Sequence, residues 1–282
     1  MELLIIASVS SMVLQNGLFN FVAKNELNKK TSVSSFNLLM YITCAVVFGA
    51  LTLFGTISVY TVLIGLVYGV LAFLTYNYRL TALKNGPMHL TMLFTTSSMI
   101  IPTLSGVFFG EEFSIYKLLV VFVLLFFLYL SFAQDKNSKI GKKWFFCCLI
   151  AFLCQGILGI LQKIHQASEY KSETSAFLLA AFVCAIVLSL ITNKGKFDSV
   201  IKKSKVILIA VACGVCGFAM NYINLILAGV LPSQLFFPVV NGSSIVLTSI
   251  SSVVLFKEHL TKKQAIGLIG GIISLIVICL VP

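Results

Sequence analysis

Charged residues are scarce in this sequence. Only 10% of its 282 residues are charged, whereas a soluble domain carries roughly a quarter. Acidic residues are the scarcest, with 9 Asp and Glu against 20 Lys and Arg. Hydrophobic residues make up 59% of the chain, and its mean hydropathy is +1.04. A soluble core of this length could not bury so much apolar surface, so the composition excludes a soluble protein and predicts an integral membrane protein.

Carboxylates are missing from the central part of every apolar run. A buried carboxylate is the usual device by which a transporter exchanges a proton for a cationic substrate. Its absence disfavours that mechanism, although an aromatic cage could still accept a cation. Neither a paired intramembrane aspartate nor a His-Glu metal set is visible, which disfavours intramembrane proteolysis. We expect no enzymatic activity, no cofactor and no metal.

The basic excess gives a formal net charge of +11 but does not predict nucleic-acid binding. The lysines form short clusters between apolar runs and never a basic domain. Such clusters are typical of topology signals beside an anionic membrane leaflet. We therefore expect membrane lipids, and no nucleic acid, as partners.

The eight cysteines all lie in apolar stretches, where free cysteine behaves as a small hydrophobe. They are Cys44, Cys147, Cys148, Cys154, Cys184, Cys213, Cys216 and Cys279. Cys213 and Cys216 have the spacing of a redox or zinc pair, but no second pair and no histidine accompany them. The sequence therefore favours a packing role for all eight.

Apolar runs of about twenty residues, the length that crosses a bilayer, indicate ten transmembrane helices. The runs fall near residues 2–23, 31–54, 60–83, 87–109, 114–133, 143–166, 174–192, 204–228, 232–256 and 262–281. Short polar segments separate them. The first run lacks the basic start and the small-residue cleavage site of a signal peptide, so we expect a retained span.

An internal repeat organises these runs. Residues 145 positions apart match repeatedly between spans three and four and spans eight and nine. The matching pairs are Leu63 and Leu208, Gly69 and Gly214, Val70 and Val215, Phe73 and Phe218, Leu80 and Leu225, Pro87 and Pro232, and Ser98 and Ser243. Because each copy has an odd number of spans, the second copy must lie upside down in the membrane. The predicted fold class is an all-α integral membrane protein with ten transmembrane helices as two inverted five-helix repeats, residues 1–134 and 143–282.

Several motifs resemble those of the drug/metabolite transporter superfamily, in particular its ten-span EamA-like transporters. They are residues 82–87 at the end of span three, Gly110-Glu111-Glu112-Phe113 after span four, and Phe256-Lys257-Glu258-His259-Leu260-Thr261 with Gln264 and Gly267. The resemblance covers essentially the whole chain. It implies a central cavity lined by spans one, three, four, six, eight and nine, with spans five and ten at the periphery.

Uncharged polar residues recur at helical spacing on the same six spans. Asn16 and Asn20, for example, lie four residues apart on one helix face. The candidate residues for a substrate cavity are Asn16, Asn20, Tyr76, Arg79, Thr95, Ser98, Gln155, Gln162, Asn221, Asn224, Gln234 and Asn241. Pro102 and Pro238 could kink their helices beside it. In the alternative interpretation these polar side chains form hydrogen bonds between helices, as they often do in membranes.

Arg79 is the only arginine and lies about one turn inside the end of span three. Its planar fork suits a carboxylate or phosphate of the substrate. Alternatively the side chain reaches out to the cytoplasmic headgroups beside Lys84. Asn224 is its counterpart in the repeat, so the architecture does not require the charge. His89 could titrate near neutral pH and couple transport to protons, or could be an interfacial histidine.

These features predict a secondary transporter or exporter of small metabolites, working by alternating access across a bacterial cell membrane. The expected substrate is neutral or zwitterionic and resembles an amino acid, with an anionic metabolite second. A lipid-linked sugar flippase of the same superfamily and a non-transporting membrane subunit or sensor are the alternatives. Spans five and ten carry no polar stripe, and Gly267 and Gly271 favour a homodimer through one of these spans.

The basic residues also predict the orientation. All 20 except Lys117, Lys163 and Lys171 lie in or beside the loops after odd-numbered spans. The positive-inside rule places those loops in the cytoplasm and both termini outside, opposite to the usual arrangement of the superfamily. A reporter that works only in the cytoplasm should therefore be inactive after Pro282 and active when inserted in the loop 134–139. Activity at Pro282 would reverse the assignment.

Overall fold

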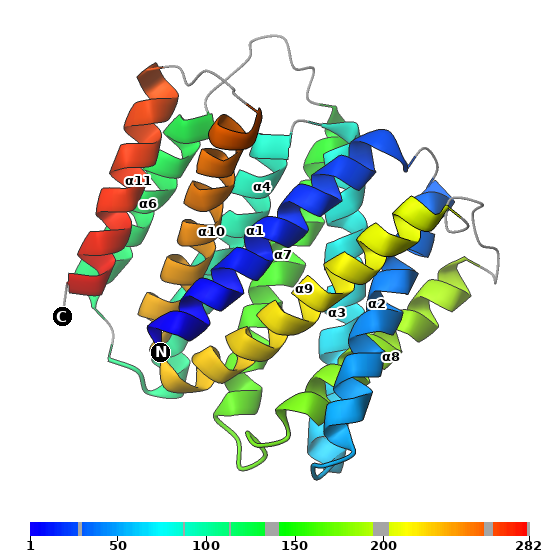
Figure 1. Cartoon of the computed structure of the whole chain (residues 1–282). Coiled ribbons are helices and arrows are strands. Elements are labelled where there is room, and N and C mark those ends of the chain that lie inside the picture. Colours follow the sequence, from blue (N-terminus) through cyan, green and yellow to red (C-terminus); the bar gives the residue numbers. More distant parts are fainter. Residues whose placement is uncertain are drawn as a thin grey trace.

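The computed structural model describes residues 1–27, 30–86, 88–112, 114–132, 141–193, 203–256 and 262–280. Within these ranges the chain forms helices and short connections, with no strand. Figure 1 shows the long helices running between the two ends of the bundle, with α1 and α9 oblique to the others. The α-helices are α1 (Glu2–Asn25), α2 (Lys30–Thr52), α3 (Val59–Asn85), α4 (Met88–Thr96), α5 (Ile100–Ser105), α6 (Ile115–Phe132), α7 (Lys142–Gln166), α8 (Thr174–Thr192), α9 (Ser204–Val230), α10 (Ser233–Phe256) and α11 (Lys262–Leu280).

The helix bounds agree with the expected apolar runs to within two residues at each end. Six helices (α1, α2 from Val33, α3, α7, α8 and α9) are long and apolar enough to cross a membrane, and three shorter apolar helices accompany them. Large apolar side chains face outward, among them Ile269 and Ile273 on α11 and Phe126 on α6, each more than half exposed. The prediction of an all-helical, multi-pass membrane protein is confirmed.

The fourth apolar run is interrupted. A turn of 3-10 helix at Ser97–Met99 separates α4 from α5, and a second turn, Gly106–Phe109, follows α5. Pro102 explains the first interruption, because it has no N–H to donate and its ring crowds the carbonyl four residues earlier, at Ser98. Pro238 lies inside α10, which remains one helix.

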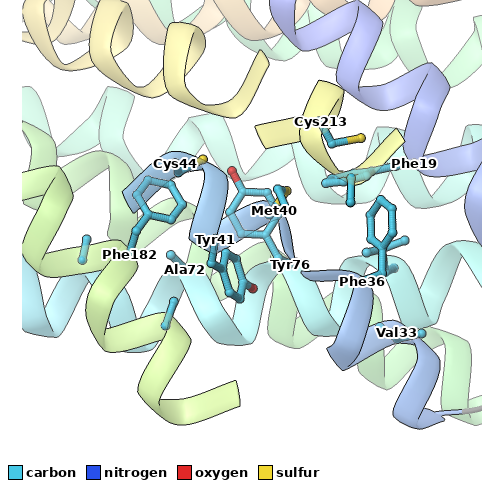
Figure 2. Packing of buried hydrophobic residues seen from close by; sticks show 14 of the residues in the cluster. Phe19, Val33, Phe36, Met40, Tyr41, Cys44, Ala72, Tyr76, Phe182 and Cys213 are labelled. Carbon is cyan, nitrogen blue, oxygen red and sulfur yellow. The ribbon is translucent and has the colours of Figure 1, made fainter. Parts of the chain in front are cut away.

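Two apolar clusters stabilise the bundle. The larger cluster joins α1, α2, α3, α8 and α9, and Figure 2 shows part of it, including Phe19, Tyr41 and Phe182. The smaller cluster joins α10 to α6 and α11 through residues such as Phe236 and Leu124. None of the eight cysteines, which all lie in described helices, forms a disulfide.

Glycine allows the closest helix contact of the larger cluster. A Cβ atom built on Gly69 of α3 would lie 2.3 Å from the carbonyl oxygen of Ala181 in α8. Gly65, one turn earlier, would place a Cβ 2.7 Å from the carbonyl oxygen of Phe177. The two backbones therefore touch, as is typical of small residues at membrane helix interfaces.

Gly69→Ala should consequently lower the melting temperature of the detergent-purified protein, because the added methyl group overpacks α3 against α8 at a cost of about 1–3 kcal/mol. The matched control is Gly17→Ala, since no atom lies within 4 Å of a Cβ at Gly17. That change should leave stability equal or slightly higher, because alanine favours a helix over glycine. Equal effects of the two variants would contradict the contact.

Candidate functional site

A polar cavity of about 70 Å³ lies in the middle of the bundle. Its wall comes from α1, α3, the interrupted helix α4–α5, α7, α9 and α10, and α8 adds Phe182. The first six are the spans that the family resemblance implies. Both apolar clusters reach the cavity wall, with Tyr68 and Ala72 from one and Phe236 and Val240 from the other.

Most of the residues singled out in the sequence meet at this cavity. Those that line it are Asn16, Tyr76, Arg79, Thr95, Ser98, Gln155, Gln162, Asn221, Asn224 and Asn241. Asn20 and Gln234 do not. Gln234 lies at the start of α10, where it accepts a hydrogen bond from the backbone N–H of Ser114 at 2.9 Å and so holds a loop. Asn20 lies one turn beyond Asn16, and its buried Oδ1 has no partner within the described residues.

A hydrogen-bond network crosses the cavity between α3, α7 and α9. The hydroxyl of Tyr68 donates to Oδ1 of Asn221 at 3.1 Å and accepts from Nε2 of Gln162 at 3.0 Å. The amide nitrogen of Asn221 donates to the Gly217 carbonyl at 2.7 Å and lies 3.5 Å from the hydroxyl of Tyr76. These contacts unite candidates from both halves of the chain and leave little freedom to their side chains.

Arg79 points into the cavity. Its Nη2 donates to Oδ1 of Asn16 and to the sulfur of Met92, and the guanidinium carbon lies 5.9 Å from the centre of the Phe19 ring. Its Nε is buried and has no partner within the described part of the chain. The geometry thus places this side chain at the cavity and not among the headgroups, and its role toward a substrate stays a prediction.

Several lining residues are not among the candidates from the sequence, and Tyr68 and Gln15 are two that form hydrogen bonds. Tyr68 has a signal that could have found it, because Tyr68, Ala72, Tyr76 and Arg79 follow one another at intervals of four, four and three on one face of α3. Gln15 has no comparable signal, because adjacent residues on a helix point to different faces and Gln15 is therefore not part of the stripe that contains Asn16. Its Nε2 donates to the Cys213 carbonyl at 2.9 Å, which ties α1 to α9.

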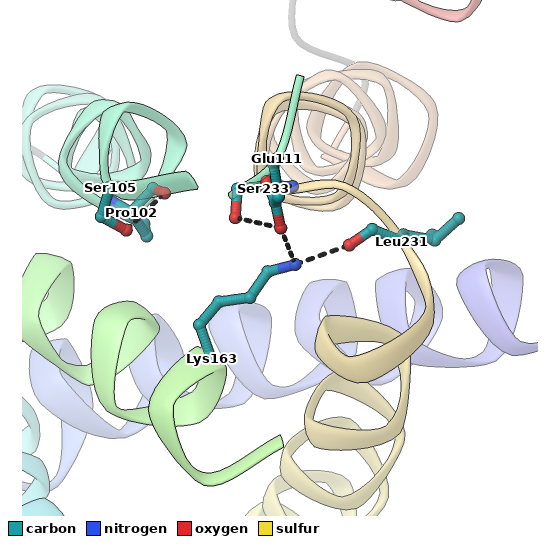
Figure 3. A network of polar contacts seen from close by, with 6 residues as sticks. All are labelled: Pro102, Ser105, Glu111, Lys163, Leu231 and Ser233. Carbon is teal, nitrogen blue, oxygen red and sulfur yellow. Dashed lines mark hydrogen bonds and ion pairs between the residues drawn. The ribbon is translucent and has the colours of Figure 1, made fainter. Parts of the chain in front are cut away.

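One end of the bundle is held together by Glu111 (Figure 3). Its Oε1 lies 2.5 Å from Nζ of Lys163 on α7, and Nζ also donates to the Leu231 carbonyl at 2.7 Å. Its Oε2 accepts from the backbone N–H of Ser233, the first residue of α10, at 2.6 Å. The Lys163 side chain is only 8% exposed, so this is a shielded ion pair in which each charge is hydrogen-bonded.

A second carboxylate makes a similar bridge at the same end. Glu173, before α8, accepts from the N–H of Ser58 at 2.9 Å and from its hydroxyl at 2.7 Å. Ser58 is the N-cap of α3, just as Ser233 begins α10. Glu111 thus binds a helix start in the second half of the chain, and Glu173 binds one in the first half. We call these contacts the Glu111 bridge and the Glu173 bridge.

Some predicted features lie outside the described residues. The turn at 257–261 is among them, and so is the side chain of His89 in α4. Within the ranges that the structure does describe, no three His, Cys, Asp or Glu residues gather as metal ligands would.

Comparison with known proteins identifies the second half of the chain. Residues 142–280 match the EamA-like transporter family. This chain carries an EamA-like transporter domain. A solved structure titled "Crystal structure of protein" has the same fold, with a TM-score of 0.79 over 99% of this chain and 97% of that one, at 14% identity. No curated protein sequence matches the chain.

The match is consistent with the drug/metabolite transporter superfamily, and the EamA-like family implies a membrane transporter of that type. The domain contributes α7, α9 and α10 to the cavity wall. It also contributes Lys163 to the Glu111 bridge and the carboxylate of the Glu173 bridge. The cavity and both bridges therefore lie between this domain and the preceding half.

The Glu173 bridge makes stability depend on pH. Burial by itself would raise the pKa of Glu173, but hydrogen bonds from Thr61 and Ser58 outweigh it and lower the pKa from 4.5 to about 2. A lowered pKa contributes stability that is fully present above pH 4.5 and is lost as the pH falls toward 2.

Glu173→Gln should therefore lower the melting temperature at neutral pH, and the difference from the wild-type protein should shrink as the pH falls below 4.5. Thermal unfolding in detergent over a pH series measures this. Glu169→Gln is the matched control, because Glu169 is exposed in the same connection. A Glu173→Gln difference that did not change with pH would argue against an ionised carboxylate in the bridge.

Proposed function

We propose that this protein is a secondary transporter that carries small, neutral or zwitterionic, amino-acid-like metabolites across a bacterial cell membrane by alternating access. The observation that carries the proposal is the cavity, whose lining comes from both halves of an EamA-like transporter and is polar but almost uncharged. Binding at the interface of two halves, near the membrane midplane, is the arrangement on which alternating access depends.

The size of the cavity supports a small substrate. A cavity needs roughly 10–15 Å³ to hold one water, whose share of liquid volume is about 30 Å³, so a volume of about 70 Å³ has room for a few waters. A ligand of about six non-hydrogen atoms, such as a small amino acid, needs comparable space. Amides and hydroxyls on the wall can pair with the polar groups of such a ligand, which would otherwise lose their hydrogen bonds to water.

Inverted repeats over residues 1–134 and 143–282 are part of the proposal, and the helix contacts support them. If α1, α2 and α3 correspond to α7, α8 and α9, each contact should have a counterpart. The packing of α3 on α7 and α8 has one in the packing of α9 on α1 and α2. Gly69 fits against α8, and Gly214, 145 residues later, would place a Cβ 3.0 Å from the Met40 carbonyl of α2.

The contact between Tyr76 and Asn221 supports the same symmetry. These residues are 145 positions apart, so the repeat makes them equivalent, and their side chains lie 3.5 Å from each other. Two equivalent residues can touch only beside the axis that relates them. The axis of the proposed repeat therefore passes by the cavity, where a rocking motion of one half against the other would change access most directly.

The Glu111 and Glu173 bridges support a conformation closed at one end. The connections that carry them, around residues 52–58, 109–114, 167–173 and 231–232, lie at the lower end of the bundle in Figure 1. Both bridges join one half of the chain to the other. Opening this end requires the carboxylates to leave their serine N–H donors, which water would then replace.

The test is counterflow of labelled amino acids into liposomes that contain only the purified protein. The wild-type protein should accumulate label, and Asn221→Ala should reduce the rate roughly tenfold, because the change removes hydrogen bonds from the central network. Thr192→Ala is the control, since Thr192 lies exposed at the end of α8 and bonds only to its own helix.

Two outcomes would contradict this proposal and favour an alternative function. Movement of a lipid-linked sugar between leaflets, without flux of any soluble metabolite, would favour a flippase. Absence of both activities from a folded protein would favour a membrane subunit or sensor that does not transport.

A further inference from the structure

The cavity holds a cation but no anion. Arg79 is on its wall, and none of the described residues that line it is Asp or Glu. Two of the five N–H donors of the guanidinium are accounted for, both on Nη2 and both to uncharged acceptors, Asn16 and Met92. Nε is buried without a partner in the described chain. An uncompensated charge inside a membrane protein is costly and points to a ligand or a counter-ion.

The guanidinium does not reach outward to the membrane surface. Arg79 is six residues before the end of α3 at Asn85, which is about 9 Å along the helix. Its partner Asn16 is nine residues before the end of α1, about 13 Å from the same end of the bundle. The side chain therefore extends toward the cavity interior, where it gains hydrogen bonds but no counter-charge.

The fold does not need this charge. The equivalent position in the second half is Asn224, which accepts a hydrogen bond from the hydroxyl of Ser8 at 2.5 Å. The position equivalent to Arg79 is thus occupied by an uncharged amide in the other half. The buried cation at Lys163 is different, because Glu111 neutralises it. Among the described residues, no acidic side chain pairs with Arg79.

We propose that Arg79 binds the carboxylate of the transported substrate. This inference rests on the proposed function and narrows it to metabolites that bear a carboxylate, amino acids included. The guanidinium fork matches two carboxylate oxygens, and the free donors on Nη1 and Nε can take them after a small movement of the side chain. The uncharged wall then accommodates the remainder of the ligand.

The phosphate of an anionic lipid headgroup presents similar oxygens. A cavity of about 70 Å³, with room for only a few waters, favours a small soluble metabolite over a headgroup. Nanodiscs of neutral phosphatidylcholine, with or without phosphatidylglycerol, separate the two sources.

The experiment compares L-alanine and lactate, which carry a carboxylate, with L-alaninamide, which does not. Thermal shifts and binding isotherms are recorded in phosphatidylcholine nanodiscs for the wild-type protein, Arg79→Asn and Arg79→Lys. We expect alanine and lactate to stabilise the wild-type protein and alaninamide to have no effect. Arg79→Asn should weaken carboxylate binding by roughly tenfold to a hundredfold, and Arg79→Lys by less.

Arg79→Asn introduces the residue that the other half already uses, so it is the variant best suited to fold. Without ligand its melting temperature should equal or exceed that of the wild-type protein, because an unpaired buried charge is removed. A lower melting temperature without ligand would indicate a structural role. Lys84→Ala, which changes a charge at the end of the same helix, controls for long-range attraction and should bind like the wild-type protein.

Four results would overturn the inference. The first is that alaninamide binds as well as alanine, and the second is that carboxylates bind Arg79→Asn as well as they bind the wild-type protein. Stabilisation by phosphatidylglycerol alone, lost in Arg79→Asn, would assign the charge to a lipid. Flux that does not change in the Arg79 variants would support the proposed transport function but contradict this binding site. Carboxylate binding without flux would support the site but contradict the proposed transport function.

Discussion

A bilayer offers no hydrogen bonds, so a polar side chain within it must find its partner inside the protein. This constraint orders the whole structure. The outward faces of α6 and α11 carry isoleucine, leucine and phenylalanine, while amides and hydroxyls gather in the centre. Where they meet they pair with one another, as Tyr68, Gln162 and Asn221 do. The cavity is therefore the place where polar groups of six apolar segments meet.

The same constraint explains why charge is used so sparingly. The ion pair of Glu111 and Lys163 lies near an end of the bundle, where Lys163 also donates to the Leu231 carbonyl and Glu111 accepts from the Ser233 N–H. Such a pair adds little net stability but is costly to break once one partner is left alone. It suits a contact that holds two halves of a transporter in one arrangement. Arg79 has no such partner and is instead surrounded by uncharged acceptors and an aromatic ring.

Much of the candidate site could be read from helical spacing. Thr95, Ser98, Gln155 and Gln162 were chosen because polar residues recur on one face, and all four reach the cavity. The same reasoning included Asn20, which does not. Spacing identifies a face of a helix, but the tilt of α1 across its neighbours decides how much of that face meets the cavity (Figure 1).

The sequence by itself determined that the protein lies in a lipid bilayer, and it determined where the helices begin and end. Apolar runs of membrane length, and the breakers between them, are local properties that need no partner. It also determined which residues could be polar neighbours. Only the tertiary structure decided which of them meet, because Tyr76 and Asn221, or Glu173 and Ser58, are separated by more than a hundred residues. Their pairing follows from how closely glycine lets the two halves approach, and no local pattern contains that distance.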